Sequence, residues 1–209
     1  MGSIFLSVGV PGFDSPFHDT CDRMLIQAAL RTFLYTVLGR KHLVFGGHPS
    51  ISPLILAVCE DLKVENKCAV TVYQSEFLDD GAPKVNSRFD RLVKVAAAST
   101  LESSLANMSE IMFRSHQFET AIFIGGDQAT LEEHAKFKYL HPTAKVIALR
   151  SAGGTSAAIA SMEAASHAPS SKSPREKDYD ELLDYVGLFT KGLEIGLNSE
   201  RNLKSEFCV

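Results

Sequence analysis

The stretch from residue 119 to residue 134, ETAIFIGGDQATLEEH, constrains the fold more than any other part of the chain. Residues 121–124 are an unbroken apolar run, which is typical of a strand buried on both faces of a parallel sheet. Gly125 and Gly126 end this run, and residues 128–139 then show a partial apolar face at helical spacing. A strand, a glycine turn and a helix in this order place unpaired backbone N–H groups at a helix N-terminus, which attracts anions. The alternative is a βα turn that needs glycine only for its dihedral angles.

Length and charge exclude several classes of protein. The chain has 209 residues, a formal charge of −4 and 45% hydrophobic residues, which fit one globular domain with a sizeable core. It lacks the clustered Lys and Arg that nucleic-acid binding requires, and no apolar run approaches the roughly 20 residues that span a bilayer. Its four cysteines show no C-x-x-C spacing, and the N-terminus shows no signal-peptide pattern. We therefore expect a cytoplasmic protein with no metal site, no cofactor, no nucleic-acid partner and no membrane association.

The arrangement of strand, Gly-Gly turn and helix recurs along the chain. It is found at Gly46 and Gly47, after a strand predicted at residues 42–45, and at Gly153 and Gly154, after a strand predicted at residues 145–149. Further strands are predicted at residues 3–8, 69–73 and 91–95, and helices at residues 22–38, 53–62, 101–116, 128–139 and 156–165. Strands that alternate with helices indicate βαβ units. The predicted fold class is therefore α/β, with a Rossmann-like parallel sheet and helices on both faces.

The C-terminal region differs in composition from the rest of the chain. Residues 166–178 are polar and aperiodic, which predicts a linker, and residues 179–197 carry apolar side chains at helical spacing. Residues 198–209 predict a frayed tail. We therefore predict a nucleotide-binding domain over residues 1–165, then the linker, then one helix that docks on the chain's own core. A contact between two copies of the chain is the alternative for this helix.

The predicted sheet brings five loops to one edge. Carboxyl ends of parallel strands lie at the same edge, and ligands bind outside them at a switch point of strand order. Three of the five loops carry a Gly-Gly pair, which favours a phosphate or nucleotide pocket. The candidate ligand-binding residues are Ser7, Gly9, Gly46, Gly47, His48, Ser50, Gln74, Gly125, Gly126, Asp127, Thr130, Glu133, Gly153, Gly154 and Thr155.

Several of these side chains also have a purely structural interpretation. His48 can donate to a phosphate or stack on a base, or it can be an ordinary surface hydrogen-bonding group. Ser50 can donate its hydroxyl to phosphate or cap the next helix, and Asp127 and Thr130 are also candidate caps. Glu133 can accept hydrogen bonds from ribose hydroxyls or stabilise an oxocarbenium-like centre in glycosidic cleavage. Its structural alternative is a solvated acid in the first helical turn.

Two common nucleotide motifs are missing from the sequence. GGHPSISP lacks the G-K-[ST] ending of a P-loop, and there is no complete G-x-G-x-x-G. The sequence therefore disfavours ATP hydrolysis and hydride transfer.

The order and spacing of the motifs resemble the SLOG superfamily, named for the SMF/DprA and LOG proteins. The segments that carry the resemblance span residues 4–165 and read LSVGVP, LVFGGHPSISPLI, VTVYQSEF, AIFIGGDQATLEE and ALRSAGGTSAA. The resemblance implies a Rossmann-like fold that binds nucleotides or nucleotide derivatives. The LOG branch comprises phosphoribohydrolases that release a base from a nucleoside monophosphate. Other branches look like sensors of NAD-derived or other nucleotide signals, working beside an effector in bacterial conflict systems.

The LOG signature, P-G-G-x-G-T-x-x-E, matches this chain only in part. Thr130 and Glu133 match its Thr and Glu, but the proline is absent, one extra residue follows the Gly-Gly pair, and Ala129 replaces the second glycine. The chain is closer to the sensor-like branches. We therefore keep two hypotheses, a nucleotide sensor that works as a homo-oligomer with a separate effector protein, and an N-glycosidic hydrolase or nucleoside transferase with Glu133 as the catalytic carboxylate. A scaffold with a vestigial pocket is the third.

Overall fold

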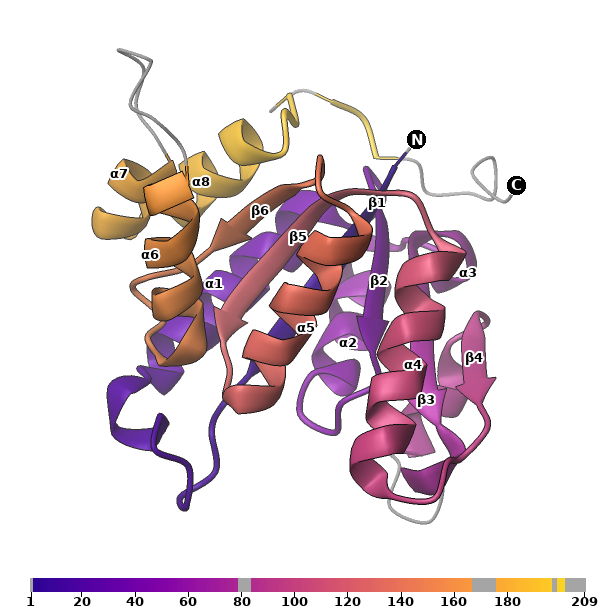
Figure 1. Cartoon of the computed structure of the whole chain (residues 1–209). Helices are drawn as coiled ribbons and strands as arrows, with labels where there is room; N and C mark the ends of the chain where they lie inside the picture. Colours follow the sequence, from indigo (N-terminus) through magenta and orange to yellow (C-terminus); the bar gives the residue numbers. More distant parts are fainter. Residues whose placement is uncertain (1, 79–83, 167–175, 197–198, 202–209) are drawn as a thin grey trace. The chain divides into compact units, whose positions relative to one another are not determined.

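The fold is an α/β sheet of six strands, in the order β4-β3-β2-β1-β5-β6 (Figure 1). The computed structural model describes residues 2–78, 84–166, 176–196 and 199–201, so most of the predicted linker and tail lies outside the described residues. The strands are β1 Ser3–Gly9, β2 His42–Gly46, β3 Val70–Ser75, β4 Leu92–Val95, β5 Phe118–Gly125 and β6 Lys145–Ala148. Neighbouring strands run parallel. This confirms the predicted Rossmann-like class.

Helices connect the strands, as the βαβ pattern predicts. Their bounds are α1 Arg23–Val37, α2 Ser52–Leu62, α3 Asn66–Ala69, α4 Leu101–Ser115, α5 Gln128–Leu140, α6 Gly154–Ser166, α7 Glu176–Glu181 and α8 Tyr185–Gly192. Three short 3-10 turns, η1 His18–Thr20, η2 Glu76–Leu78 and η3 Lys84–Arg88, lie in segments that the sequence left as loops. Within the described ranges, no helix combines the length and the hydrophobicity needed to cross a bilayer.

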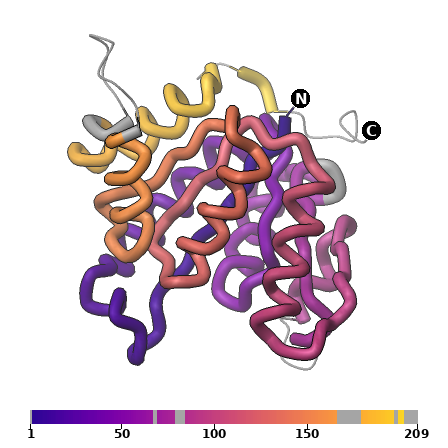
Figure 2. The backbone as a smooth tube through the Cα atoms, in the orientation of Figure 1, coloured from indigo at the N-terminus to yellow at the C-terminus, as the bar shows by residue number. Residues whose placement is uncertain are grey.

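Contacts between residues divide the chain into two compact units. The first unit comprises Met1–Leu6, Val37–Glu119 and Glu200–Val209, and it contains β2, β3, β4 and the first half of β1. In this unit α4 covers one face of the strands and α2 covers the other (Figure 2). Phe5 on β1 packs edge-to-face against Phe113 on α4, with ring centroids 4.8 Å apart. Every residue of β3 is buried, as expected for a strand covered on both faces.

The second unit comprises Ser7–Thr36 and Thr120–Ser199. It holds the end of β1, then α1, β5, α5, β6, α6, α7 and α8. The apolar run at residues 121–124 is fully buried in β5, as predicted. Phe189 on α8 packs edge-to-face against Phe33 on α1, with ring centroids 5.2 Å apart. The C-terminal segment therefore docks on the core of its own unit.

The predicted single helix over residues 179–197 is wrong, because the structure has two helices there. α7 ends at Glu181, Leu183 adopts a left-handed conformation with φ +56°, and Asp184 caps the start of α8. The Asp184 carboxylate accepts a hydrogen bond from the Gly187 amide at 2.9 Å. A capping side chain at this position starts a new helix and prevents the earlier one from continuing.

The strand order reverses beside β1. From β1 the chain builds β2, β3 and β4 on one side, and it then returns to place β5 and β6 on the other side. In doubly wound sheets this switch point is where ligands bind, outside the carboxyl ends of the strands. The last residues of β1 and β5, including Ser7, Gly9 and Gly125, all belong to the second unit. The candidate site can therefore be described within that unit alone.

Candidate functional site

A serine and a glutamate form the polar centre of the candidate site. Ser7 near the end of β1 is buried, and its hydroxyl donates a hydrogen bond to Glu133 Oε2 at 2.6 Å. Glu133 lies on α5 and is half-buried. The interpretation of Glu133 as a solvated surface acid is therefore wrong, because its carboxyl group is bonded to a buried strand residue 126 positions away.

Burial raises the pKa of the Glu133 carboxyl from 4.5 to about 7. The hydrogen bond from Ser7 opposes this shift, the charge of Asp127 adds to it, and Lys136 lowers it. The low-dielectric surroundings outweigh the stabilising bond because the ionised form loses its hydration. Near neutral pH the carboxyl group therefore exchanges readily between its charged and neutral forms. Perturbed acids of this kind cluster at functional sites.

Asp127 is the N-cap of α5, as one of its two interpretations predicted. Its side chain accepts a hydrogen bond from the Ala129 amide at 3.1 Å, and its carbonyl accepts one from the Thr130 amide at 3.1 Å. Thr130 is buried inside the helix and is not the cap residue. Two of the amides at this helix N-terminus are therefore already bonded within the protein, so the N-terminus offers fewer open donors than the sequence suggested.

The Gly125-Gly126 turn is explained by packing against the protein. Both residues have positive φ, +67° and +87°. A Cβ at Gly125 would lie 2.4 Å from the Gly9 carbonyl oxygen, and one at Gly126 would lie 2.3 Å from Thr130 Oγ1. The Gly126 amide donates to the Gly9 carbonyl at 2.8 Å, and the Gly125 amide donates to Ser156 Oγ at 2.9 Å. These two amides are thus used to join β1, β5 and α6.

The Gly153-Gly154 turn packs closely against the Gly125-Gly126 turn. Both residues have positive φ, and a Cβ at Gly154 would lie 2.6 Å from the Gly126 carbonyl oxygen. The Thr155 amide donates to that same oxygen at 3.2 Å, and Thr155 Oγ1 donates to the Asp127 carbonyl at 3.0 Å. The structure therefore brings together one set of predicted residues in the second unit, namely Ser7, Gly9, Gly125, Gly126, Asp127, Thr130, Glu133, Gly153, Gly154 and Thr155.

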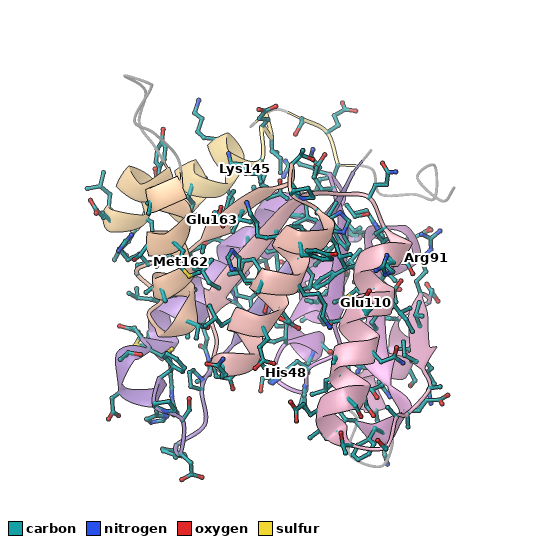
Figure 3. All side chains as sticks on the ribbon, in the orientation of Figure 1. His48, Arg91, Glu110, Lys145, Met162 and Glu163 are labelled. Carbon is teal, nitrogen blue, oxygen red and sulfur yellow. The ribbon has the colours of Figure 1, made fainter. Side chains whose placement is uncertain are left out.

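The other five predicted residues belong to the first unit. Gly46 ends β2, and a Cβ at Gly47 would lie 2.4 Å from Asn86 Nδ2. Asn86 in turn donates to the side-chain oxygen of Gln74 at 2.9 Å, and both side chains are buried. His48 is exposed, and its Nδ1 accepts a hydrogen bond from the Ser50 amide at 3.2 Å (Figure 3).

The interpretation of Ser50 as the cap of the next helix is wrong. The N-cap of α2 is Ile51, without a side-chain hydrogen bond, and Pro53 lies in the first turn as expected. The Ile51 and Ser52 amides donate instead to the His48 carbonyl, so backbone bonds replace a side-chain cap.

Two important polar residues were missed at the sequence level. Asn86 lies in a segment that reads as a polar loop, and its burial is visible only in the fold. Asp180 on α7 is buried, and one of its oxygens accepts hydrogen bonds from the Arg150 amide at 2.6 Å and the Ser151 amide at 3.2 Å. Its other oxygen accepts the Ser151 hydroxyl, which also contacts the Tyr185 hydroxyl. Neither residue stands in a motif that could have identified it.

Among the described residues, no group of three or more His, Cys, Asp and Glu side chains could hold a metal ion.

Comparison with known proteins identifies the family. No curated protein and no solved structure matches the chain significantly. A family model described as the SLOG cluster3 family matches residues 16–193, which include α1 to α8 and both Gly-Gly turns of the second unit. This range extends past residue 165, where the resemblance read from the motifs ended, and it takes in the C-terminal helices. The chain belongs to the SLOG cluster3 family.

Proposed function

We propose that the protein binds a nucleotide or nucleotide derivative where β1 and β5 end in the second unit. The observation that carries this proposal is the Ser7–Glu133 pair, a buried hydroxyl bonded to a half-buried carboxyl group beside the switch point of strand order. Membership of the SLOG family also supports a nucleotide-related ligand.

Glu133 is suited to the ribose of such a ligand. A carboxylate accepts hydrogen bonds from two vicinal hydroxyls, and a carboxyl group near its pKa can also donate one. Two of the glycine turns hold the surrounding backbone in positive-φ conformations, and their packing fixes the position of α5 relative to β1. This arrangement supports a preformed site whose selectivity comes from side chains, with the glycine backbone as its framework.

Calorimetry on the full chain tests the proposal. The probes are AMP, ADP-ribose, NAD and cyclic dinucleotides, and at least one should bind. Glu133→Gln should weaken that binding by about 10- to 100-fold, because hydrogen bonds to a charged group contribute about 1.5–3 kcal/mol. The matched control is Glu132→Gln, since Glu132 is the exposed neighbour on the same helix. Absence of binding across the whole panel contradicts the proposal.

Cleavage of an N-glycosidic bond is the second candidate function. A carboxyl group with a pKa of about 7 can protonate a leaving group or stabilise an oxocarbenium-like centre near neutral pH. Release of free base from AMP or NAD, followed by chromatography, should be lost in Glu133→Gln and kept in Glu132→Gln. Turnover that survives Glu133→Gln removes this residue from the mechanism. Binding without base release favours the sensor.

A sensing role also requires an output. By the resemblance to sensor-like SLOG branches, we propose that the protein forms a homo-oligomer and acts on a separate effector protein. Light scattering coupled to size-exclusion chromatography, with and without the nucleotide that binds, measures the first part. A monomer under both conditions contradicts it.

A further inference from the structure

Three planar side chains gather on the loop between β1 and α1. The Phe13 and His18 rings lie with centroids 4.7 Å apart and planes inclined by 35°, and the guanidinium carbon of Arg23 lies 5.2 Å from the Phe13 centroid. Arg23 Nη2 also lies 3.4 Å from each ring nitrogen of His18. We refer to Phe13, His18 and Arg23 together as the Phe13 platform.

The apolar member of the platform is exposed to solvent. Phe13 is 82% exposed, although burying such a ring normally stabilises a fold by about 1.5–3 kcal/mol. Isolated exposed apolar residues are common, and Tyr139 on α5 is 83% exposed. Phe13 differs from an isolated residue because a cation and an imidazole pack against it, which leaves the rest of the ring open to solvent.

Backbone hydrogen bonds hold the platform in place. The Ser15 amide donates to the Gly12 carbonyl at 3.0 Å and the His18 amide donates to the Ser15 carbonyl at 3.0 Å, so one turn contains Phe13 and a second turn follows it. His18 Nδ1 lies 3.2 Å from the Pro11 carbonyl oxygen and donates to it. The rings are therefore positioned before any ligand arrives, which lowers the entropy cost of binding.

Both ends of the loop are anchored to the glycine turns of the candidate site. At its start, the Gly9 carbonyl accepts the Gly126 amide, and at its end the Asp22 amide donates to the Ala152 carbonyl at 3.2 Å. The Thr20 carbonyl oxygen packs so closely on Gly153 that a Cβ there would lie 1.8 Å away. All these residues belong to the second unit. The platform thus extends the edge on which Ser7 and Glu133 lie.

We infer that the Phe13 platform stacks the planar base of the nucleotide ligand, with Arg23 favouring its negative charge. Bases stack on aromatic rings and guanidinium planes in many nucleotide-binding proteins, and a nearby cation suits an anionic ligand. The inference rests on the proposed function, because it assigns the base-binding part of the same site.

Calorimetry on two variants tests the inference. Phe13→Ala should weaken AMP and ADP-ribose binding by about 5- to 100-fold, the range expected for losing one stacked base. Binding of ribose 5-phosphate, which has no base, should change less than twofold. Tyr139→Ala is the matched control, an equally exposed aromatic residue of the same unit, and it should leave all three affinities unchanged.

Fluorescence provides a direct readout. The chain contains no tryptophan, so Phe13→Trp creates a single reporter whose emission a stacked purine should quench. Tyr139→Trp should show no quenching at the same AMP concentration.

The outcomes separate the inference from the proposed function. If wild-type protein binds AMP or ADP-ribose and Phe13→Ala binds them equally well, the inference is overturned and the proposed function stands. Equal losses for ribose 5-phosphate and for AMP also overturn it, because the base is then not what Phe13 recognises. If the wild type binds no nucleotide of the panel, both are overturned. Quenching in Phe13→Trp together with a selective loss in Phe13→Ala supports both.

Discussion

At the scale of single residues, Glu133 decides what the candidate site can do. Its carboxyl group is held by Ser7 at 2.6 Å, and burial raises its pKa to about 7. The sequence placed Glu133 correctly about one turn into the helix that follows a Gly-Gly pair, but it left three roles open. Only the fold shows that the side chain turns toward β1.

Glu133 should make stability fall as pH rises. Its folded-state pKa lies above the ordinary value of 4.5, so its contribution is fully present below pH 4.5 and is lost as pH rises to about 7. Over this window the free energy of unfolding should drop by about 1–3 kcal/mol from this group. In urea unfolding, Glu133→Gln should flatten the pH dependence and be more stable than wild type at pH 8. Equal slopes for Glu133→Gln and the exposed control Glu132→Gln contradict this prediction.

His42 should act in the opposite direction. Its Nδ1 lies 2.9 Å from Ser3 Oγ and its Nε2 lies 3.0 Å from Thr71 Oγ1. Burial, followed by the charges of His116 and Arg91, lowers the pKa of His42 to about 4. The stability that depends on neutral His42 is present above pH 6.5 and is lost as pH falls to about 4.

Urea unfolding between pH 7.5 and pH 4 measures this effect. The loss assigned to His42 should be about 2–3 kcal/mol, and His42→Gln should reduce the acid sensitivity of the chain. His48→Gln, at an exposed position, is the control. An unchanged slope in His42→Gln would show that another group is responsible.

At the scale of elements, the two glycine turns of the second unit allow close packing between neighbouring loops. Gly153 has φ +70°, and a Cβ there would meet the Thr20 carbonyl oxygen at 1.8 Å. Gly153→Ala should therefore destabilise the protein by about 2–4 kcal/mol, from backbone strain together with overpacking. A Cβ at Gly12, in the β1–α1 loop that also contains Thr20, meets nothing within 4 Å, so Gly12→Ala should change stability by less than about 0.5 kcal/mol. Thermal unfolding of both variants measures the difference, and Gly153→Ala should have the lower melting temperature. Equal melting temperatures would contradict the packing argument.

Asp180 links α7 to the loop after β6 through hydrogen bonds. The buried carboxylate of Asp180 accepts hydrogen bonds from the half-buried Arg150 and Ser151 amides, so Asp180→Ala should cost about 2–3 kcal/mol by leaving these donors unpaired. Glu181→Ala changes the exposed neighbour and should cost far less. Chemical denaturation of the two variants measures the difference. Similar midpoints would mean that water replaces the carboxylate.

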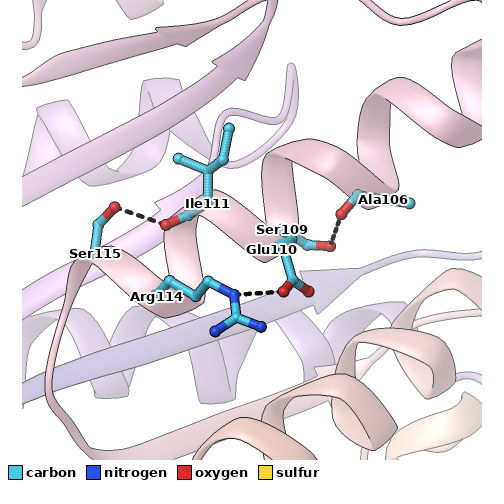
Figure 4. Close-up of polar contacts among 6 residues, drawn as sticks. All are labelled: Ala106, Ser109, Glu110, Ile111, Arg114 and Ser115. Atoms are coloured by element: carbon cyan, nitrogen blue, oxygen red, sulfur yellow. Dashed lines mark hydrogen bonds and ion pairs between the residues drawn. The ribbon is translucent and has the colours of Figure 1, made fainter.

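Helix α4 spans Leu101–Ser115, which agrees closely with the helix predicted at residues 101–116. Thr100 and Ser103 form a capping box at its start. On its exposed surface Arg114 Nε contacts Glu110 Oε1 at 2.5 Å, and the Ser115 hydroxyl donates to the Ile111 carbonyl at 2.7 Å (Figure 4). Such surface pairs contribute only about 0.3–0.5 kcal/mol, so the apolar face decides the position of the helix.

At the scale of the whole molecule, the prediction concerns the ligand. A nucleotide that binds only the folded chain stabilises it by about 2.7 kcal/mol at 100 times its dissociation constant. The melting temperature should therefore rise with the concentration of any nucleotide that binds in calorimetry. The rise should be smaller for Glu133→Gln at equal concentration. A binding nucleotide that leaves the melting temperature unchanged would indicate that it also binds the unfolded chain.

The sequence by itself determined the class of the fold. Apolar runs such as residues 121–124 are typical of strands covered on both faces, and helices between such runs indicate parallel βαβ connections. Motif order was enough to identify the superfamily, since local turns and spacing are encoded by adjacent residues.

The tertiary structure alone decided which groups meet. Ser7 and Glu133 are far apart in the chain, and no local pattern encodes a contact between them. The glycines at 125, 126, 153 and 154 were expected to open the backbone to a ligand, but close packing explains them, because a Cβ at each would lie within 3 Å of another atom of the protein. The sequence also did not predict the burial of Asp180 and Asn86. Burial depends on the packing of distant segments, and a polar residue in a loop has the same local sequence whether or not it is covered.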